Sequence, residues 1–142
     1  MGKIIKRLPT QKKLSEIIPS GAEGGKEFAR IVDLLLFHHA RREGKNLTLF
    51  DDRSGDWCGL DSFAGEGHMG EVRVGYQYKF FPSNLTAKHR SEIKKSLEKS
   101  LEGWEKSKIT KWILVTPDDL VESAKKKGGG DVSWFTDLKK SL

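Results

Sequence analysis

The sequence has a single cysteine, Cys58, and lacks any long run of apolar residues. One cysteine cannot form a disulfide within the chain or hold a zinc ion alone, which excludes disulfide scaffolds and zinc fingers. No apolar stretch approaches the roughly 20 residues needed to cross a bilayer, and residues 1–13 contain no apolar core of signal-peptide length. We therefore expect a cytoplasmic protein without a membrane partner, in which any metal ion is held by oxygen ligands.

Basic residues are scarce in the middle of the chain, between residues 51 and 72. The 142 residues carry 26 Lys and Arg against 20 Asp and Glu, a formal charge of +6. Between residues 51 and 72 the acids outnumber a single arginine, while lysine-rich segments lie on both sides: Asp51, Asp52, Asp56, Asp61, Glu66 and Glu71 against Arg53. This arrangement suits a cation at a reaction centre framed by surfaces that attract phosphate, although a solvated acidic loop is the alternative interpretation.

Length and composition favour one domain, since 36% hydrophobic residues are enough to build a single core. Residues 1–23 are basic and end in Pro19-Ser20-Gly21, which predicts a loosely held arm ahead of a domain over residues 24–142. We also expect the chain to be part of a longer protein, because the apolar face of its last predicted helix is unfinished at Leu142.

Apolar spacing predicts the elements of an α/β fold. Phe28, Val32 and Leu36 recur at helical spacing, which indicates a helix over residues 25–42. Alternation of apolar and polar residues from Val72 to Phe81 indicates a strand. The other predicted elements are strands at 47–50, 57–63 and 112–115 and helices at 86–103, with Thr86 as N-cap, and 133–142. The order αβββαβ predicts a sandwich with a central mixed four-stranded sheet flanked by helices.

Three predicted segments carry residue types that phosphodiester hydrolysis needs. Asp61 falls on the second strand, Gln77 and Lys79 share one face of the third, and Glu27 lies on the first helix. Hydrolysis needs a divalent cation, a carboxylate to hold it, and a group that orients the attacking water. Asp61 and the Gln77 amide oxygen can hold the cation, and the long Lys79 side chain can reach the water or phosphate. Mg²⁺ suits such an all-oxygen site.

At these residues the sequence resembles the PD-(D/E)xK phosphodiesterase superfamily. The segments Gly59-Leu60-Asp61-Ser62-Phe63 and Gln77-Tyr78-Lys79, with the helix glutamate, are similar to its Mrr-like branch, where glutamine replaces the acid. The run YQYKFFPSNLTAKHRSEIKKSLEKSL, which starts at Tyr76, and the segment KWILVTPDDL at 111–120 are similar to N-terminal effector nucleases of bacterial anti-phage STAND ATPases. The resemblance spans residues 24–142 and implies a restriction-endonuclease-like fold.

The resemblance also implies roles for particular residues. Asp61, Gln77 and the carbonyl of Tyr78 would bind the metal, and Lys79 would be the catalytic lysine. Glu27 would bind metal-bound water, with Glu23 as the competing glutamate. Asp51 or Asp52 could assist the metal, and Cys58, three residues from Asp61, is predicted in the core on the opposite sheet face.

The implied activity is a Mg²⁺-dependent DNA endonuclease, with Mn²⁺ as a possible substitute. It would cut double-stranded DNA with little sequence preference, as the effector domain of an antiviral defence protein that forms a homo-oligomer when activated through regions outside this chain. Basic residues on the second helix are the expected DNA contacts: Lys88, Arg90, Lys94 and Lys95. Two alternatives remain: an Mrr-type restriction or junction-cleaving nuclease, and a non-catalytic basic nucleic-acid-binding or assembly module.

Overall fold

The computed structural model describes residues 17–19, 21–50, 57–65, 73–81, 84–122 and 130–141. Its elements are α2 (Ala22–Arg42), β1 (Asn46–Leu49), β2 (Ser62–Gly65), β3 (Arg73–Tyr78), α3 (Ala87–Glu102), α4 (Trp104–Ser107), β4 (Lys111–Val115) and α5 (Asp131–Lys140). The sheet has the order β1-β2-β3-β4, with the first two pairs antiparallel and β3 parallel to β4. The prediction of an α/β fold around a mixed four-stranded sheet is therefore confirmed.

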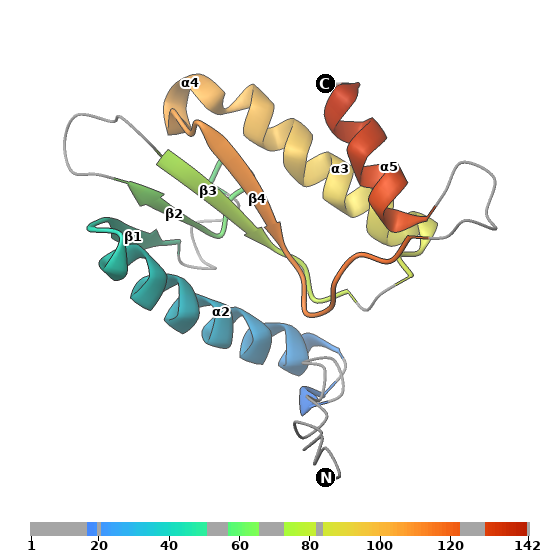
Figure 1. Ribbon diagram of the computed structural model, residues 1–142, viewed down its shortest axis with the longest axis horizontal. Coiled ribbons are helices and arrows are strands. Elements are labelled where there is room, and N and C mark those ends of the chain that lie inside the picture. The colour runs from blue at the N-terminus through green and yellow to red at the C-terminus, as the bar shows by residue number, and fades with distance from the viewer. Residues whose placement is uncertain are drawn as a thin grey trace, which may run out of the picture.

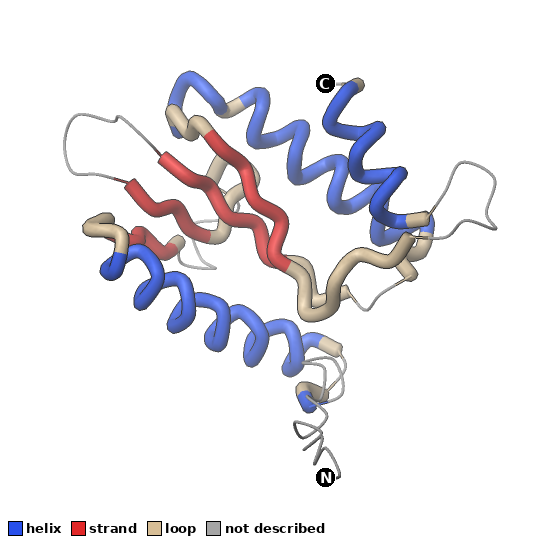
Figure 2. Tube along the Cα trace, viewed as in Figure 1, coloured by secondary structure: helices blue, strands red, loops and turns tan. Residues whose placement is uncertain are grey.

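Helices cover both faces of this sheet. Figure 1 shows α2 along one face and α3 with α5 along the other, and Figure 2 traces the loops that join these layers. On the α2 side, Phe28 and Val32 form one buried cluster and Ala40 packs with Tyr76 in another. On the α3 side, Ile93 is fully buried. The apolar spacing that predicted the first helix therefore gives the face of α2 that lies against the sheet.

The predicted second strand over residues 57–63 is wrong at its N-terminal half. Trp57 pairs with Leu60 in an isolated antiparallel bridge, and Cys58 and Gly59 between them have φ of 54° and 66°. Residues in this left-handed region cannot continue an extended strand, so the chain makes a tight turn before β2. Asp61 consequently precedes β2 instead of lying within a strand. Cys58 lies in that turn, half-buried beside Gly103, and not on a sheet face.

The structure describes residues 17–19 and 21–23 of the predicted N-terminal arm, and these residues lead directly into α2. Ile18 is 5% exposed and packs with Phe28 and Val32. Helix α2 begins at Ala22, and Gly24 approaches the Pro19 carbonyl so closely that a Cβ there would collide with it. Burial of Ile18 attaches this segment to the core, and residues 1–16 lie outside the described part.

Helix α3 begins as predicted, at a Thr86 cap. The Thr86 hydroxyl accepts a hydrogen bond from the His89 N–H at 3.1 Å, and the Thr86 N–H donates to His89 Nδ1 at 3.2 Å. This reciprocal pair gives a hydrogen-bond acceptor to two backbone N–H groups at the start of the helix, as a capping box does. Ile93 and Leu97 then face the core, whereas Leu101 is half exposed.

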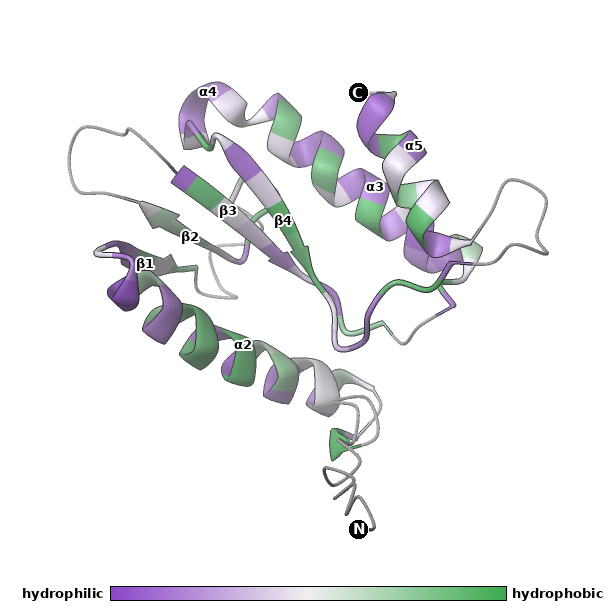
Figure 3. Cartoon of the chain, in the orientation of Figure 1, coloured by the Kyte–Doolittle hydropathy of each residue, from purple (hydrophilic) through white to green (hydrophobic). Residues whose placement is uncertain are grey.

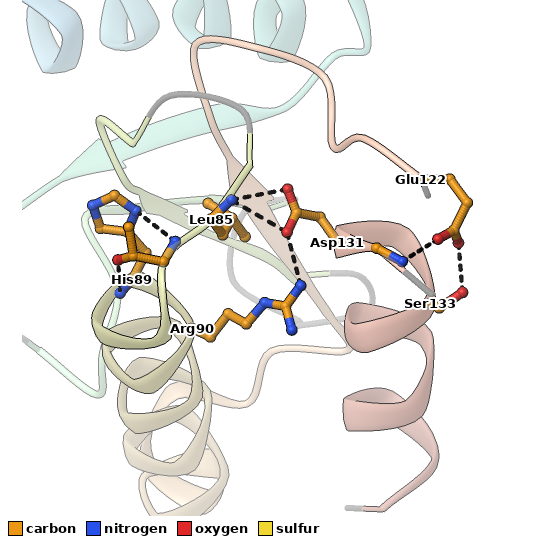
Figure 4. A network of polar contacts seen from close by, with 8 residues as sticks. Leu85, His89, Arg90, Glu122, Asp131 and Ser133 are labelled. Atoms are coloured by element: carbon orange, nitrogen blue, oxygen red, sulfur yellow. Dashed lines mark hydrogen bonds and ion pairs between the residues drawn. The ribbon is translucent and has the colours of Figure 1, made fainter. Parts of the chain in front are cut away.

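A buried carboxylate joins α5 to the start of α3. The Asp131 side chain, 3% exposed, accepts hydrogen bonds from the Leu85 N–H at 3.0 Å and from Arg90 Nη2 at 3.0 Å (Figure 4). The Arg90 guanidinium also lies over the Trp134 ring, 5.2 Å from its centroid. Figure 4 shows a second contact at this end of α5, where Glu122 accepts from the Ser133 hydroxyl. Arg90 is therefore committed to the α3–α5 contact.

Hydropathy follows the same layering. Figure 3 shows hydrophobic residues in the middle turns of α2, with hydrophilic residues toward its C-terminal end. Among the described residues, no helix combines the length and the apolar character needed to span a bilayer.

Candidate active site at the ends of β2 and β3

Asp61 is held against strand β3 by its backbone and by its side chain. Its N–H donates to the Tyr76 carbonyl at 2.8 Å, and its Oδ2 accepts from the Tyr78 N–H at 2.7 Å. Its own carbonyl accepts from the Phe50 N–H at 3.1 Å. These bonds attach the carboxylate to the backbone on either side of Gln77, so the structure brings Asp61 to the Gln77-Tyr78-Lys79 segment. A hydrogen bond to a charged acceptor is stronger than one between neutral groups, which fixes this position.

Gln77 carries an unusual buried oxygen. The residue is 4% exposed, and its Oε1 has no hydrogen-bond partner among the described residues. A buried polar atom without a partner costs about 1–3 kcal/mol, which is the kind of cost tolerated at functional sites. Tyr76 and Tyr78 pack toward α2, so strand alternation directs the Gln77 side chain to the opposite face.

Lys79 follows β3 directly. Its N–H donates to the Val115 carbonyl at 2.9 Å, which extends the parallel ladder with β4 by one residue. The residue is half-buried. Lys79 therefore has a defined backbone position one residue beyond the Tyr78 amide that binds Asp61.

On the α2 side, a cavity of about 760 Å³ opens beside Asp61. Two acids, Asp33 and Asp61, line it together with two bases, Lys26 and Arg30. The rest of its wall is largely apolar and aromatic: Ala22, Gly25, Phe28, Ala29, Leu49, Phe50, Tyr78 and Phe80. Gln77 and Lys79 are absent from this lining, so Tyr78 is the residue of the Gln77-Tyr78-Lys79 segment that reaches the cavity, beside Asp61.

A chain of hydroxyl groups links α2 to β2 and β3 at this cavity. The Tyr78 hydroxyl donates to Asp33 Oδ1 at 2.7 Å and lies 2.6 Å from Ser62 Oγ. Because the single phenolic proton goes to Asp33, Ser62 donates to the Tyr78 oxygen. Burial, supported by the Asp33 and Asp61 carboxylates, raises the pKa of Tyr78 far above its usual range. Tyr78 is therefore a neutral donor at physiological pH and holds Asp33 toward the sheet.

The structure does not bring Glu27 to this site. Its carboxylate pairs with Arg30 on the same helix at 3.2 Å, its side chain is 47% exposed, and it does not line the cavity. Asp33, six residues further along α2, lines the cavity with Asp61 instead. The sequence carried a sign of this, because Asp33 is the one charged residue in the apolar run from Ile31 to Phe37. Glu23 is exposed in the first turn of α2.

The donor set fits a hard cation held by few protein ligands. The described residues contain no group of three or more His, Cys, Asp or Glu side chains placed to share a metal ion. They do offer two carboxylates, Asp61 and Asp33, that line one cavity on the α2 side, whereas the unpartnered Gln77 amide oxygen lies on the opposite face of the sheet. Mg²⁺ commonly keeps several waters and takes only one or two carboxylates, so this sparse oxygen set is compatible with it. Asp51 and Asp52 lie outside the described residues.

Three of the four basic residues expected to contact DNA lie on the surface of α3. Lys88, Lys94 and Lys95 are exposed. Arg90 is the exception, because its ion pair with Asp131 turns it toward α5. Helical periodicity alone could not separate Arg90 from its neighbours, since the residue that pairs with it lies 41 positions away in the sequence.

Comparison of the chain with protein-family models, with curated proteins and with solved structures finds no match.

Proposed function

We propose that this chain is a metal-dependent DNA endonuclease of the PD-(D/E)xK superfamily, related to its Mrr-like branch and restriction-endonuclease-like in fold. It would hydrolyse phosphodiester bonds of double-stranded DNA with little sequence preference and leave 5′-phosphates. Its setting would be the effector domain of a bacterial antiviral defence protein.

One observation carries this proposal. The Asp61 carboxylate accepts a hydrogen bond from the Tyr78 N–H, which joins the acid to the backbone of the Gln77-Tyr78-Lys79 segment. Asp61 and Gln77, the first residues of the two parts of the D…QxK pattern, are 16 positions apart in the sequence. Their short separation in the sheet therefore follows from the pairing of β2 with β3 and not from local spacing. The αβββαβ order and the parallel β3–β4 pair support the same assignment.

In this proposal each residue has a chemical task. Asp61 would hold Mg²⁺ on the α2 side, where Asp33 lines the same cavity, whereas the Gln77 ligand that the resemblance implies lies on the opposite face of the sheet. When bound, the cation would offset the negative charge that develops on the phosphate. Lys79 would orient the attacking water or contact a nonbridging oxygen, as a compact charge on a long flexible stem can. Asp33, fixed by Tyr78, replaces Glu27 as the helix acid of the proposed site.

Cleavage of supercoiled plasmid tests the proposal. With Mg²⁺ or Mn²⁺ we expect nicking or linearisation by the wild type, and none with EDTA. Lys79→Ala and Asp61→Asn should each lower the rate by at least about 100-fold, the usual contribution of a positioned proton-transfer or charge-stabilising group. The matched controls are Lys111→Ala, at the other end of the β3–β4 pair, and Asp137→Asn, exposed on α5.

Cutting that persists in EDTA, or that survives in Lys79→Ala at the wild-type rate, would overturn the assignment. If the wild type is inactive, the assay should be repeated with the chain fused to an oligomerisation domain, because activation by assembly is part of the proposal. Parallel assays on branched, methylated and plain duplexes separate the restriction and junction-cleaving alternatives.

A binding module is the second candidate, and the exposed lysines of α3 favour it. Lys88, Lys94 and Lys95 would contact phosphates while Asp61 served only to fix β2 on β3. A binding module should show salt-dependent DNA affinity that changes neither with Mg²⁺ nor with Lys79→Ala. This alternative would be favoured if the forced oligomer also failed to cut DNA.

A further inference from the structure

Strand β4 forms one edge of the sheet. Among the described strands it pairs with β3 alone, and it stands last in the sheet order (Figure 1). The Val115 carbonyl faces β3, because it accepts a hydrogen bond from the Lys79 N–H. Backbone groups of successive strand residues point to alternate sides, so the N–H and C=O groups of Trp112 and Leu114 point away from β3. This edge can therefore accept the backbone of a further strand.

The side chains of β4 have the character of a strand that is covered on both sides. Trp112, Ile113, Leu114 and Val115 form a continuous apolar run, yet all four are only half-buried. Continuous apolar runs are typical of central strands in parallel sheets, whereas edge strands usually carry charges, prolines or bulges that block pairing. Within β4 the one charged residue is Lys111, at its start. This composition indicates that another strand covers the edge of β4.

A small pocket adjoins the start of β4, on the side of the sheet that α3 covers. Its volume is about 220 Å³. Pockets that hold whole small molecules usually measure about 300–1,000 Å³, so this one suits a single large side chain. Its wall includes Leu101 and Trp104, which are 50% and 56% exposed, and Trp112, whose buried indole N–H has no acceptor among the described residues. A strand added to β4 would place an anchor side chain beside this pocket.

The surface around the pocket is basic. Residues 104–111, which run from α4 into β4, carry three lysines and one acid, a formal charge of +2: Lys106, Lys108, Lys111 and Glu105. All three lysines are exposed, and Lys111 lines the pocket. A basic surface beside an apolar pocket complements a segment that has carboxylates next to an apolar anchor. The edge, the pocket and the charge thus describe one occupant, an extended acidic peptide.

We propose that the edge of β4 and the adjoining pocket form a docking site for an extended, acidic segment of a partner protein. The segment would pair with the outward backbone groups of Trp112 and Leu114 as a fifth strand. One apolar side chain would enter the pocket, and acidic residues beside it would face Lys108 and Lys111. In such strand addition, backbone hydrogen bonds give affinity and alternate side chains give specificity. The inference does not depend on the proposed nuclease activity, because the cavity beside Asp61 lies on the α2 side of the sheet.

Fluorescence anisotropy with a labelled peptide tests the site. The probe is the peptide DEVWVTV, which has an acidic end, alternating side chains and a central tryptophan as anchor. We expect the intact chain to bind it saturably. Lys111→Glu should weaken this binding about tenfold, because like charges then meet, and the peptide KKVWVTV should bind that variant about tenfold more tightly than DEVWVTV does. The matched control is Lys140→Glu, exposed on α5, which should bind DEVWVTV as the wild type does.

Two modified probes test strand addition itself. N-methyl groups on either the odd or the even residues of DEVWVTV remove alternate backbone N–H groups. One set alone should abolish binding, since the other set points away from β4. Bound DEVWVTV should also slow the amide hydrogen exchange of Trp112 and Leu114 by about tenfold or more. The Ile113 amide points toward β3 and should exchange at an unchanged rate.

A folded chain that does not bind DEVWVTV would overturn the proposal, as would equal binding of the two methylated probes. Labelled oligothymidylate is the remaining arm of the test. If it binds the wild type and loses affinity in Lys111→Glu while DEVWVTV does not bind, the surface serves a nucleic acid and the peptide proposal is wrong. Circular dichroism of Lys111→Glu excludes loss of fold as the cause of weaker binding, because the Lys111 side chain is exposed.

Discussion

At the residue scale, the candidate site depends on Tyr78 as much as on Asp61. The Tyr78 backbone N–H donates to the Asp61 carboxylate, and its hydroxyl donates to Asp33 and accepts a hydrogen bond from the Ser62 hydroxyl. One residue therefore connects β2, β3 and α2. The family resemblance assigned only the carbonyl of Tyr78 a role, so the contribution of its side chain came from the structure.

Alkaline titration reports on this arrangement, because Tyr76 and Tyr78 are the two tyrosines of the chain. Burial raises the pKa of both hydroxyl groups above the usual value of about 10. The folded state thus favours the neutral phenols, so this stabilisation is complete below pH 10 and is lost as the pH rises further. We expect the ultraviolet absorbance of tyrosinate to appear only above pH 10, together with unfolding.

Protein unfolded in guanidinium provides the control, and there both tyrosines should titrate near pH 10. A gradual rise in tyrosinate around pH 10 while the circular dichroism stays native would contradict the buried, hydrogen-bonded position of Tyr78.

At the element scale, the turn over residues 57–60 determines where β2 begins. Gly59 has φ of 66°, and a Cβ there would lie 2.5 Å from the Ser96 carbonyl oxygen and 2.9 Å from Ser100 Oγ. The Ser100 hydroxyl also donates to the Cys58 carbonyl at 2.8 Å. The small Ser96 and Ser100 side chains of α3 therefore allow this turn to pack closely. The turn directs the chain so that Asp61 lies beside β3.

Gly59→Ala should accordingly destabilise the protein strongly. Left-handed backbone costs a non-glycine residue about 1–2 kcal/mol, and the steric conflict with α3 should add about 1–3 kcal/mol. Gly44→Ala is a matched control, because Gly44 has φ of 71° but nothing within 4 Å of a Cβ. Urea unfolding measures both, and equal losses for the two variants would show that the turn does not press against α3.

At the scale of the whole molecule, the exposed lysines of α3 and the cavity that holds two acids lie on opposite faces of the sheet. Exposed lysines lie on α3, whereas the cavity with Asp33 and Asp61 lies on the α2 side of the sheet. Lys88 and Lys95 are seven residues apart and so share one side of α3. A nucleic acid that follows this helix would contact both.

The salt dependence of DNA binding measures that contact. Each phosphate contact contributes about 0.9 to the slope of log K against log salt, so Lys88→Gln with Lys95→Gln should reduce the slope by about 2. The control pair is Arg41→Gln with Lys45→Gln, near the C-terminal end of α2 in the other layer, for which we expect no change. A slope unaffected by the α3 pair would place the DNA track elsewhere.

The sequence by itself determined the kinds of element and their order. Periodicity of apolar residues and the Thr86 cap predicted the helices and strands, because these signals arise from contacts within a few residues. It also identified Asp61, Gln77 and Lys79 as candidates, and the structure brings Asp61 to the Gln77-Tyr78-Lys79 segment. Their chemical roles stay predictions until cleavage is measured.

Only the tertiary structure decided which neighbours these residues have. It placed Asp33 instead of Glu27 on the cavity, turned Arg90 to Asp131, buried Ile18, and made a left-handed turn of Cys58 and Gly59. Each outcome depends on a partner distant in the sequence or on packing against another element. Helical spacing specifies which residues of α2 share a face. Packing of the helix against the sheet decides which of these residues line the cavity.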